Sequence, residues 1–414
     1  MGGVAWGLGD LIAGQGGQAP LPSDRFGRWR QTPAIALLWG LLALLAASAL
    51  VPLTASPIAS PTTAPAPHRP RDADLALYDR AIARIAHGEN YYTFITAEHR
   101  RAHYPIRPGV AVRLPTLAYL AAALGVDEAQ PAPLAMAAAL ALMLGVIGAW
   151  WRRLGALGVS PSQRRLGTAL VFFGAALGLN RYYFVLHELW SGMLLALALG
   201  LHRPDHGQWR AAFLAAALAL AIREHAAPFV LLMAAMAAHR CAWPEAAAWV
   251  LLLALFAAAL AWHLHLIAAQ TLPSDPTGPG WLALRGLGGF LSNTVLSSNL
   301  RFLPHTIAGP LTILMLLGWA GWRSSAGQAG LAFFLGYALL FAIAGRDDNF
   351  YWGAMITPLM PLGLAFAPMA LASLLRAALS PSHLAPLSSI TPACSANTSC
   401  SSSAAASRPI NPAN

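Results

Sequence analysis

Long apolar runs alternate with short polar segments along most of the chain. The first run, residues 33–53, reads "PAIALLWGLLALLAASALVPL" and is long enough to cross a bilayer as a helix. Further apolar segments follow at 114–125, 134–151, 166–180, 189–202, 211–222, 226–239, 246–269, 307–322, 329–345 and 354–375. Several are shorter than the roughly 20 residues of a perpendicular transmembrane helix, so flanking residues must complete them. The pattern predicts an all-α, polytopic membrane helix bundle.

The longest polar interruption is the first loop, residues 56–111. After a Pro-rich connector it contains "RDADLALYDRAIARIAHGENYY", residues 71–92. Apolar side chains recur there at steps of three and four, at Leu75, Tyr78, Ile82 and Ile85. This spacing predicts an amphipathic helix of about 14 residues, ended by Gly88 and lying in the membrane interface with its apolar side down.

Two aspartates, Asp72 and Asp74, stand at the start of this predicted helix. An aspartate at a helix N-terminus is favoured as a cap and by the helix dipole. Capping requires only one of them. A second role, facing a cavity beside the membrane, therefore stays open for either residue.

The distribution of arginine indicates a topology. If 114–151 crosses the membrane only once, with 114–125 interfacial or re-entrant, most arginine-bearing short loops fall in the cytoplasm. This choice gives about ten or eleven spans, a cytoplasmic N-terminal lead over residues 1–32 and a membrane domain over 33–376. The Ser/Ala/Pro-rich tail, 377–414, is then cytoplasmic and is predicted to be disordered.

Composition agrees with a membrane protein: 57% of residues are hydrophobic, 10% are charged and the mean hydropathy is +0.55. Lysine is absent, and the wealth of Ala, Gly and Pro is typical of a GC-rich bacterial genome. The net charge of +10 does not indicate nucleic-acid binding, because many arginines stand where a positive-inside bias would place them. We therefore expect a multi-pass protein of a bacterial inner membrane.

Unusual charges gather in the predicted external segments. Each charged cluster could be explained without a binding role, as a solvated turn or an interfacial loop. Structural turns, however, have no reason to gather on one side of the membrane, so the shared side favours a common site. The candidate substrate-binding residues are Arg113, His187, Glu188, Arg223, Glu224, His225, Arg346, Asp348 and Tyr351.

Motifs of several other enzyme classes are absent from the sequence. It has no P-loop, GxSxG, HExxH or CxxC pattern. His263 and His265 are two residues apart and do not share a helix face, and the three cysteines are scattered, so no metal site is predicted. A divalent cation held by Glu188, Glu224 or Asp348 with the aspartates remains open, and no cofactor can be specified.

Three stretches resemble the GT-C class of membrane glycosyltransferases. They are "DAD" at residues 72–74 leading into interfacial helices, "YPIRPGVAVRLPTLAYLAAALG" at 104–125, and "NFYWGAMITPLMPLG" at 349–363 before the last span. The resemblance covers roughly residues 33–376. This sequence differs from better-defined members of the class in two ways: it shows no C-terminal soluble domain, and alanine separates the two aspartates of its acidic pair.

The resemblance implies sugar transfer from a polyprenyl-phosphate donor, as in mannosyltransferase-like members, to a lipid, glycan or protein acceptor on the external face. Asp72 or Asp74 would serve as the catalytic base, and arginines such as Arg113, Arg223 and Arg346 would stabilise the leaving phosphate. The expected partners are membrane lipid and the donor itself. The oligomeric state stays open.

Two other classes compete with this interpretation: a membrane transporter or lipid flippase, and a non-catalytic subunit of an envelope-assembly complex. A transporter favours charges buried in mid-span and paired internal repeats, which the sequence does not show clearly. The discriminating observation is geometric. An enzyme requires Asp74, Glu188, Arg223 and Arg346 to surround one cavity.

Overall fold

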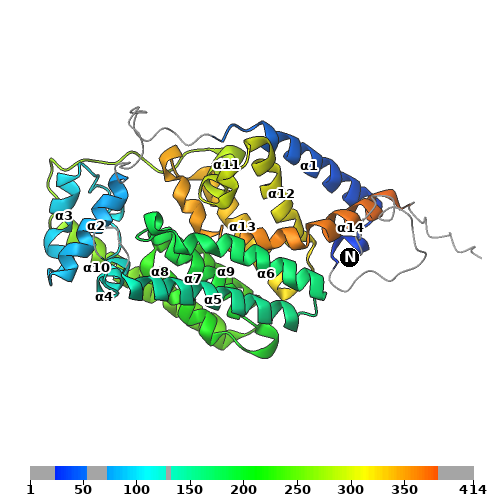
Figure 1. The fold of residues 1–414 in the computed structure, drawn as a ribbon, viewed down its shortest axis with the longest axis horizontal. Coiled ribbons are helices and arrows are strands. Elements are labelled where there is room, and N and C mark those ends of the chain that lie inside the picture. The colour runs from blue at the N-terminus through cyan, green and yellow to red at the C-terminus, as the bar shows by residue number, and fades with distance from the viewer. Residues whose placement is uncertain (1–23, 54–71, 127–131, 381–414) are drawn as a thin grey trace, which may run out of the picture.

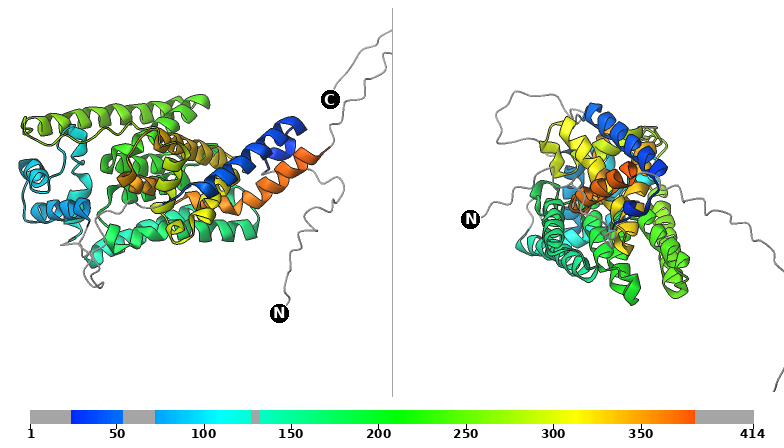
Figure 2. Two further views of the ribbon diagram at one scale, coloured as in Figure 1. Left: turned by 90° about the horizontal axis from the view of Figure 1, so that it is seen from above. Right: turned by 90° about the vertical axis from the view of Figure 1, so that its right-hand side faces the viewer.

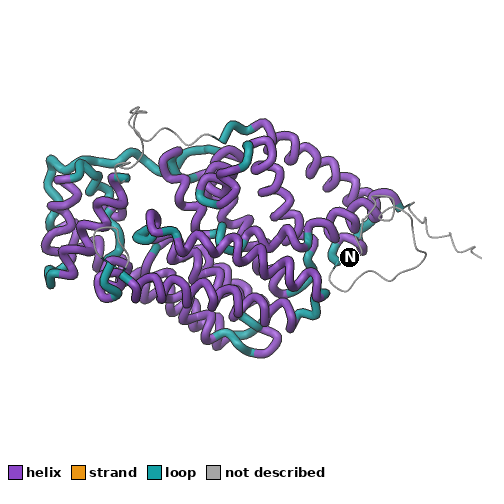
Figure 3. The backbone as a smooth tube through the Cα atoms, viewed as in Figure 1, coloured by secondary structure: helices purple, strands orange, loops and turns teal. Residues whose placement is uncertain are grey.

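We describe the protein from a computed structural model, in which residues 24–53, 72–126 and 132–380 are placed. Within these ranges the protein is helical, and the only β-type pairings are isolated bridges (Figure 3). The Pro-rich connector and most of the low-complexity tail lie outside the described residues. The predicted all-α class is confirmed for the part of the chain described.

The α-helices occur in the following order: α1 Gln31–Leu50, α2 Ala73–Ala86, α3 Tyr91–Arg101, α4 Thr116–Ala123, α5 Pro133–Ala156, α6 Pro161–Ala175, α7 His187–Leu201, α8 Arg210–Ile222, α9 Ala227–His239, α10 Trp243–Ala268, α11 Gly286–Leu296, α12 His305–Gly321, α13 Ser325–Ile343 and α14 Ala367–Leu379. Short 3-10 helices join several of them. Two are used below, η6 Glu224–Ala226 and η8 Asp347–Met355.

Two groups of helices form the body of the molecule (Figure 1). One group contains α5 to α10, in which α7 packs on α5 and α8, and α9 packs on α10. The other contains α1 and α11 to α14, and α1 runs beside α14 (Figure 2). The segment from η8 to α14 joins the groups, because η8 packs against both α7 and α11.

Among the described residues, four helices are long and apolar enough to cross a membrane: α1, α5, α10 and α13. The other apolar helices are shorter. Helix α4 has eight residues, which at 1.5 Å per residue cannot cross a hydrocarbon core of about 30 Å. The segment 114–125 is therefore not a full span.

Helices α2 and α3 form a cap at one end of the long axis, and the C-terminal end of α14 lies at the other (Figures 1 and 2). The predicted helix in the first loop is confirmed, since α2 ends at Ala86 and Gly88 adopts a left-handed φ of 88°. Its apolar face is buried against α3 and α4. The expectation that this face rests on lipid is therefore wrong, because neighbouring helices cover it.

Helix α7 and η8 approach closely at Gly192. A Cβ atom at this position would lie 2.0 Å from the carbonyl oxygen of Ala354, a distance that no side chain tolerates. Small residues allow such backbone contact between helices in membranes. The contact brings Glu188, one turn earlier on α7, toward the first residues of η8.

The last residues of the N-terminal lead are packed at the far end of the molecule. Asp24 is buried and accepts hydrogen bonds from the backbone N–H groups of Phe26 and Gly27, and the hydroxyl of Ser373 on α14 also contacts it. Asp24 and Phe26 are thus packed against the bundle, whereas residues 27–30 are exposed.

Candidate functional site

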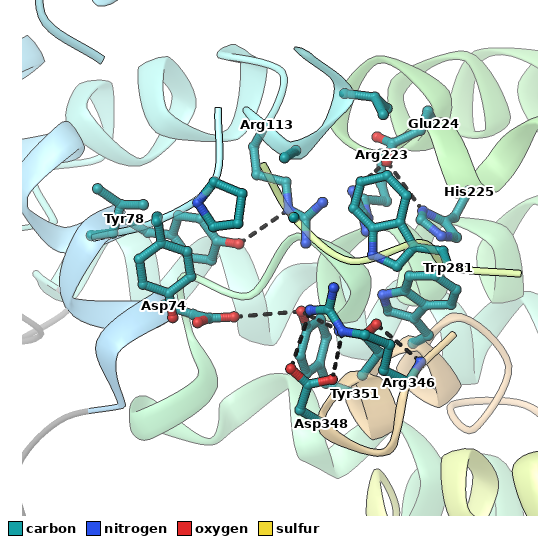
Figure 4. Close-up of a pocket in the computed structure, with 18 of the residues that line it drawn as sticks. Asp74, Tyr78, Arg113, Arg223, Glu224, His225, Trp281, Arg346, Asp348 and Tyr351 are labelled. Carbon is teal, nitrogen blue, oxygen red and sulfur yellow. Dashed lines mark hydrogen bonds and ion pairs between the residues drawn. The ribbon is translucent and has the colours of Figure 1, made fainter. Parts of the chain in front are cut away.

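A polar cavity of about 260 Å³ lies where the α2 cap meets the helix bundle (Figure 4). Residues from five separate parts of the chain surround it: the start of α2, the segment after α3, the α8–α9 junction, the segment before α11, and η8. Among its lining residues are Asp74, Tyr78, Arg113, Arg223, Glu224, His225, Trp281, Arg346, Asp348 and Tyr351. Most of the side chains singled out in the sequence therefore meet in one place.

Asp74 lies in the first turn of α2 and faces this cavity. Its Oδ2 accepts a hydrogen bond of 3.4 Å from the hydroxyl of Tyr351. Burial raises the pKa of the Asp74 carboxyl, the charges of Glu188 and Asp348 add to the rise, and Arg113 and the Tyr351 hydrogen bond oppose it. Asp74 thus retains its proton at a higher pH than an exposed aspartate does.

Asp72 has a different position. It is the N-cap residue of α2, but its side chain forms no capping hydrogen bond, and its backbone N–H donates to the hydroxyl of Tyr182. It is not among the residues that line the cavity. Of the two aspartates considered as a base, only Asp74 faces the site.

A buried ion cluster stands at the inner wall of the cavity. Arg223 and Glu224 line the cavity, whereas Glu188, which we expected around it, is not among the lining residues and contacts Arg223 instead. Helix α8 ends at Ile222, and Arg223 takes an extended conformation that turns the chain into η6. Its Nε lies 2.7 Å from Oε1 of Glu188 on α7, and both side chains are fully buried. Its Nη1 also contacts Glu224, whose Oε1 lies 3.3 Å from Nδ1 of His225.

This cluster leaves polar atoms without hydrogen-bond partners. Nη2 of Arg223 and Oε2 of Glu188 are buried and have none among the described residues. Buried polar atoms are usually paired, by water or a ligand where protein groups do not reach. Since Arg223 lines the cavity, its free Nη2 marks a place where an anionic oxygen would bind.

Arg113 differs from the other arginines of the cavity because it forms no direct ion pair with a carboxylate of the described residues. Its Nε donates to the hydroxyl of Tyr78 at 3.1 Å, and within the described ranges no carboxylate lies within 4.0 Å of its guanidinium. Its backbone carbonyl accepts from the hydroxyl of Tyr91 at 2.7 Å. The guanidinium is therefore held firmly at the cavity wall without being neutralised by a direct ion pair.

The preceding residue, Val112, is fixed as well. Nε2 of His263, on α10, lies 3.1 Å from the Val112 carbonyl oxygen, and the hydroxyl of Tyr92 lies 3.0 Å from Nδ1 of the same ring. The imidazole thus spans two partners as a neutral ring, donating from Nε2 and accepting at Nδ1. No local pattern in the sequence predicts this structural role of His263.

On η8, Arg346 and Asp348 pair with one another through two contacts, Nε to Oδ1 at 3.1 Å and Nη2 to Oδ2 at 3.2 Å. Both side chains are partly exposed, at 30% and 52%. His187 does not line the cavity with them; it packs edge-on against Tyr78, with ring centroids 4.8 Å apart. The structure thus places His187 behind the site.

Two other arginines of the first loop, Arg100 and Arg107, bind Asp275 and do not line the cavity. Arg100 forms two hydrogen bonds to the carboxylate of Asp275, at 2.7 and 2.9 Å, and Arg107 donates to the Asp275 carbonyl oxygen. These contacts tie α3 to the segment between α10 and α11. Of the two arginines between α3 and α4, Arg107 and Arg113, only Arg113 lines the cavity.

Within the described residues, no group of three His, Cys, Asp or Glu side chains is arranged to hold a metal ion. The acidic residues considered for a divalent cation are instead paired with arginine: Glu188 and Glu224 with Arg223, and Asp348 with Arg346. This donor set does not fit a cation site, and we derive no chemical step through a metal.

An apolar groove of about 240 Å³ lies between α4, α5, α7 and α8. Its lining is almost wholly hydrocarbon: Leu117, Leu120, Ala121, Leu124, Leu142, Phe184, Trp190, Leu194, Leu218 and Ile222. A small pocket of about 10 Å³ lies between the two spaces: Tyr78 and Arg113 line both it and the cavity, and Leu117 lines both it and the groove. Arg113 is therefore on the side of the cavity nearer the groove, and packed side chains separate the two spaces.

Comparisons with known proteins give no relative. No protein-family model, curated protein or solved structure matches the chain significantly. The function must therefore be argued from the site.

We predict that Arg223→Met destabilises the protein by about 3–5 kcal/mol, because it leaves Glu188 as an uncompensated buried charge. Arg346→Met should cost no more than about 1 kcal/mol, since its ion pair is partly exposed. Thermal unfolding of both variants in the same detergent checks this difference. Equal stability losses would contradict the ranking.

Proposed function

We propose that the protein is an integral membrane glycosyltransferase that moves a sugar from a polyprenyl-phosphate donor to an acceptor hydroxyl at the external membrane face. One observation carries the proposal: a polar cavity containing a guanidinium without a direct ion pair lies close to an apolar groove, with one small pocket between them. Such a combination suits an amphiphile with an anionic head and a hydrocarbon tail.

The lipid phosphate would lie between Arg113 and Arg223. Arg113 has no carboxylate partner among the described residues, and Nη2 of Arg223 is free to donate. Guanidinium groups bind phosphate oxygens through charge-assisted hydrogen bonds. From this position the isoprenoid tail would run past Leu117 into the groove.

Asp74 would act as the general base. It accepts the proton of the acceptor hydroxyl while that oxygen forms a bond to the anomeric carbon of the sugar. The bond between the anomeric carbon and the phosphate oxygen breaks, and its electron pair leaves with the polyprenyl phosphate. Arg113 and Arg223 stabilise this charge, and a single displacement inverts the anomeric centre.

Charge also favours an orientation in which the cavity is external and both termini are cytoplasmic, as in a bacterial inner-membrane protein. The end of the bundle away from the cavity carries many arginines at helix termini: Arg25, Arg152, Arg153, Arg164, Arg165, Arg203, Arg210, Arg240, Arg323 and Arg376. Cytoplasmic loops are enriched in such residues. In this orientation the shorter apolar helices α7, α8, α12 and α14 would cross the membrane together with the four long ones, and α4 would not.

The orientation can be measured with an impermeant thiol reagent. In a variant with Cys394→Ser and Cys400→Ser, the exposed Cys241 between α9 and α10 should react only after cytoplasmic access is given. With Cys241→Ser added, Glu89→Cys beside α3 should react in intact cells. The reverse result would invert the proposed topology.

The competing classes are less well supported by the same geometry. A transporter site is expected near mid-membrane, whereas Glu188 and Arg223 lie at the ends of α7 and α8. A non-catalytic subunit does not need a half-buried carboxylate beside a free guanidinium. The transfer assay below separates all three classes, because only the enzyme forms a glycosylated product.

We predict that Asp74→Asn lowers sugar transfer from a polyprenyl-phosphate hexose by about 10²–10⁴-fold, the contribution typical of a general base. Asp72→Asn should stay within about threefold of the original rate, because its side chain is outside the cavity. Product formation in proteoliposomes measures both effects. Undiminished transfer by Asp74→Asn would remove it as the base.

The pH dependence follows from the raised pKa of Asp74. A base works only when deprotonated, so the rate should fall, as pH decreases, at a pH above the ordinary aspartate pKa of 3.8. Asp348→Asn removes a charge that raises this pKa, and the acidic limb should therefore move to lower pH. Asp347→Asn is the matched control, since Asp347 is exposed and outside the cavity lining. If the acidic limb of the pH–rate profile does not move in Asp348→Asn, the assignment of Asp74 as the general base is contradicted.

A further inference from the structure

The side of the cavity opposite Asp74 is aromatic. Trp281 and His225 lie there in Figure 4, and Trp352 completes the wall. These rings come from three separate elements: the segment before α11, η6 and η8. The rings of His225 and Trp352 are in contact, with centroids 4.4 Å apart.

Trp281 is held in place through its backbone. Its carbonyl oxygen accepts from the N–H of Gly345 at 2.7 Å, and the next residues, Leu282 to Arg285, run antiparallel to the end of α13. In this segment Leu282 and Leu284 are 87% and 88% exposed, whereas Trp281 is half-buried at the cavity. The fixed backbone gives the indole a defined position.

Trp352 carries a free hydrogen-bond donor. The side chain is 5% exposed and lines the cavity, yet its indole Nε1 has no partner among the described residues. A buried indole N–H usually finds an acceptor. An oxygen atom of a ligand in the cavity would supply the acceptor that this N–H lacks.

This wall differs in chemistry from the other two parts of the site. The arginines suit the phosphate and the groove suits the tail, but indole faces with a single N–H donor suit neither. A pyranose ring has apolar C–H faces and a rim of hydroxyl oxygens, which match an aromatic face and an indole donor. The cavity of about 260 Å³ is at the small end of ligand pockets, so it accommodates a compact headgroup.

We infer that Trp281 and Trp352 form the subsite for the transferred sugar, and that this sugar is a single monosaccharide. The inference rests on the proposed function and deepens it. With the ring against the tryptophan wall and the phosphate at Arg113, the side of the cavity next to Asp74 is left for the acceptor hydroxyl.

The test compares two probes on the protein in nanodiscs: a polyprenyl phosphate without sugar, and the same lipid carrying one mannose or one glucose. At least one glycosylated lipid should bind the original protein about tenfold more tightly than the bare lipid, as expected for one good aromatic contact with a hydrogen bond. Trp281→Ala should abolish this preference without changing the affinity for the bare lipid. Trp352→Phe, which removes the indole N–H and shortens the ring system, should reduce the preference for the glycosylated lipid.

Controls make the outcomes distinct. Trp39→Ala, at a tryptophan of α1 that is 68% exposed, should leave both affinities unchanged. Trp281→Phe should keep part of the preference, and its thermal unfolding shows whether the wall is intact. If Trp281→Ala weakens both probes equally, or neither, the sugar subsite is refuted while the lipid-phosphate site stands. If the original protein binds no probe, the proposed function fails, and the inference with it.

Discussion

The ion pair between Arg223 and Glu188 is the constraint on which the site depends. Both side chains are fully buried, so each requires the other to offset the loss of hydration. The pair joins the start of α7 to the α8–α9 junction, and Glu224 supplies a second acceptor within the same turn. Removal of the Arg223 charge would leave both glutamates without their cation, whereas removal of one glutamate leaves Arg223 paired with the other.

This arrangement divides the arginines of the cavity into different roles. Arg223 is largely neutralised by two glutamates, and Arg346 is paired with Asp348 at the rim. Among the cavity arginines described, Arg113 is the one without a direct ion pair: its Nε donates to the hydroxyl of Tyr78, and its backbone carbonyl accepts from the hydroxyl of Tyr91. The site therefore combines a rigid, balanced interior with one available cation beside a carboxylate of raised pKa, Asp74.

Much of this organisation was predictable from local patterns. The three- and four-residue spacing from Leu75 to Ile85 predicted α2, and the arginine distribution predicted that 114–125 does not cross the membrane. The choice between Asp72 and Asp74 was not predictable, because it depends on which face of the first helical turn meets η8. The roles of His263 and Trp281 were also hidden, since each acts through partners more than 60 residues away in sequence. The contacts of Arg100 and Arg107 with Asp275 were not predictable either, because Asp275 lies far along the chain.

The segment from Trp281 to Arg285 has one side that faces the cavity and another that carries the exposed Leu282 and Leu284. An extended segment alternates its side chains with a period of two, and its hydrogen bonds to Ile343 and Ala342 set the register. Replacement of a leucine by another apolar residue keeps that register. Insertion or deletion of a single residue between Trp281 and Ala283 would instead move the indole to the opposite side of the segment, because the hydrogen bonds of Ala283 and Arg285 hold the register after it. At this point, spacing along the chain constrains evolution more strongly than residue identity does.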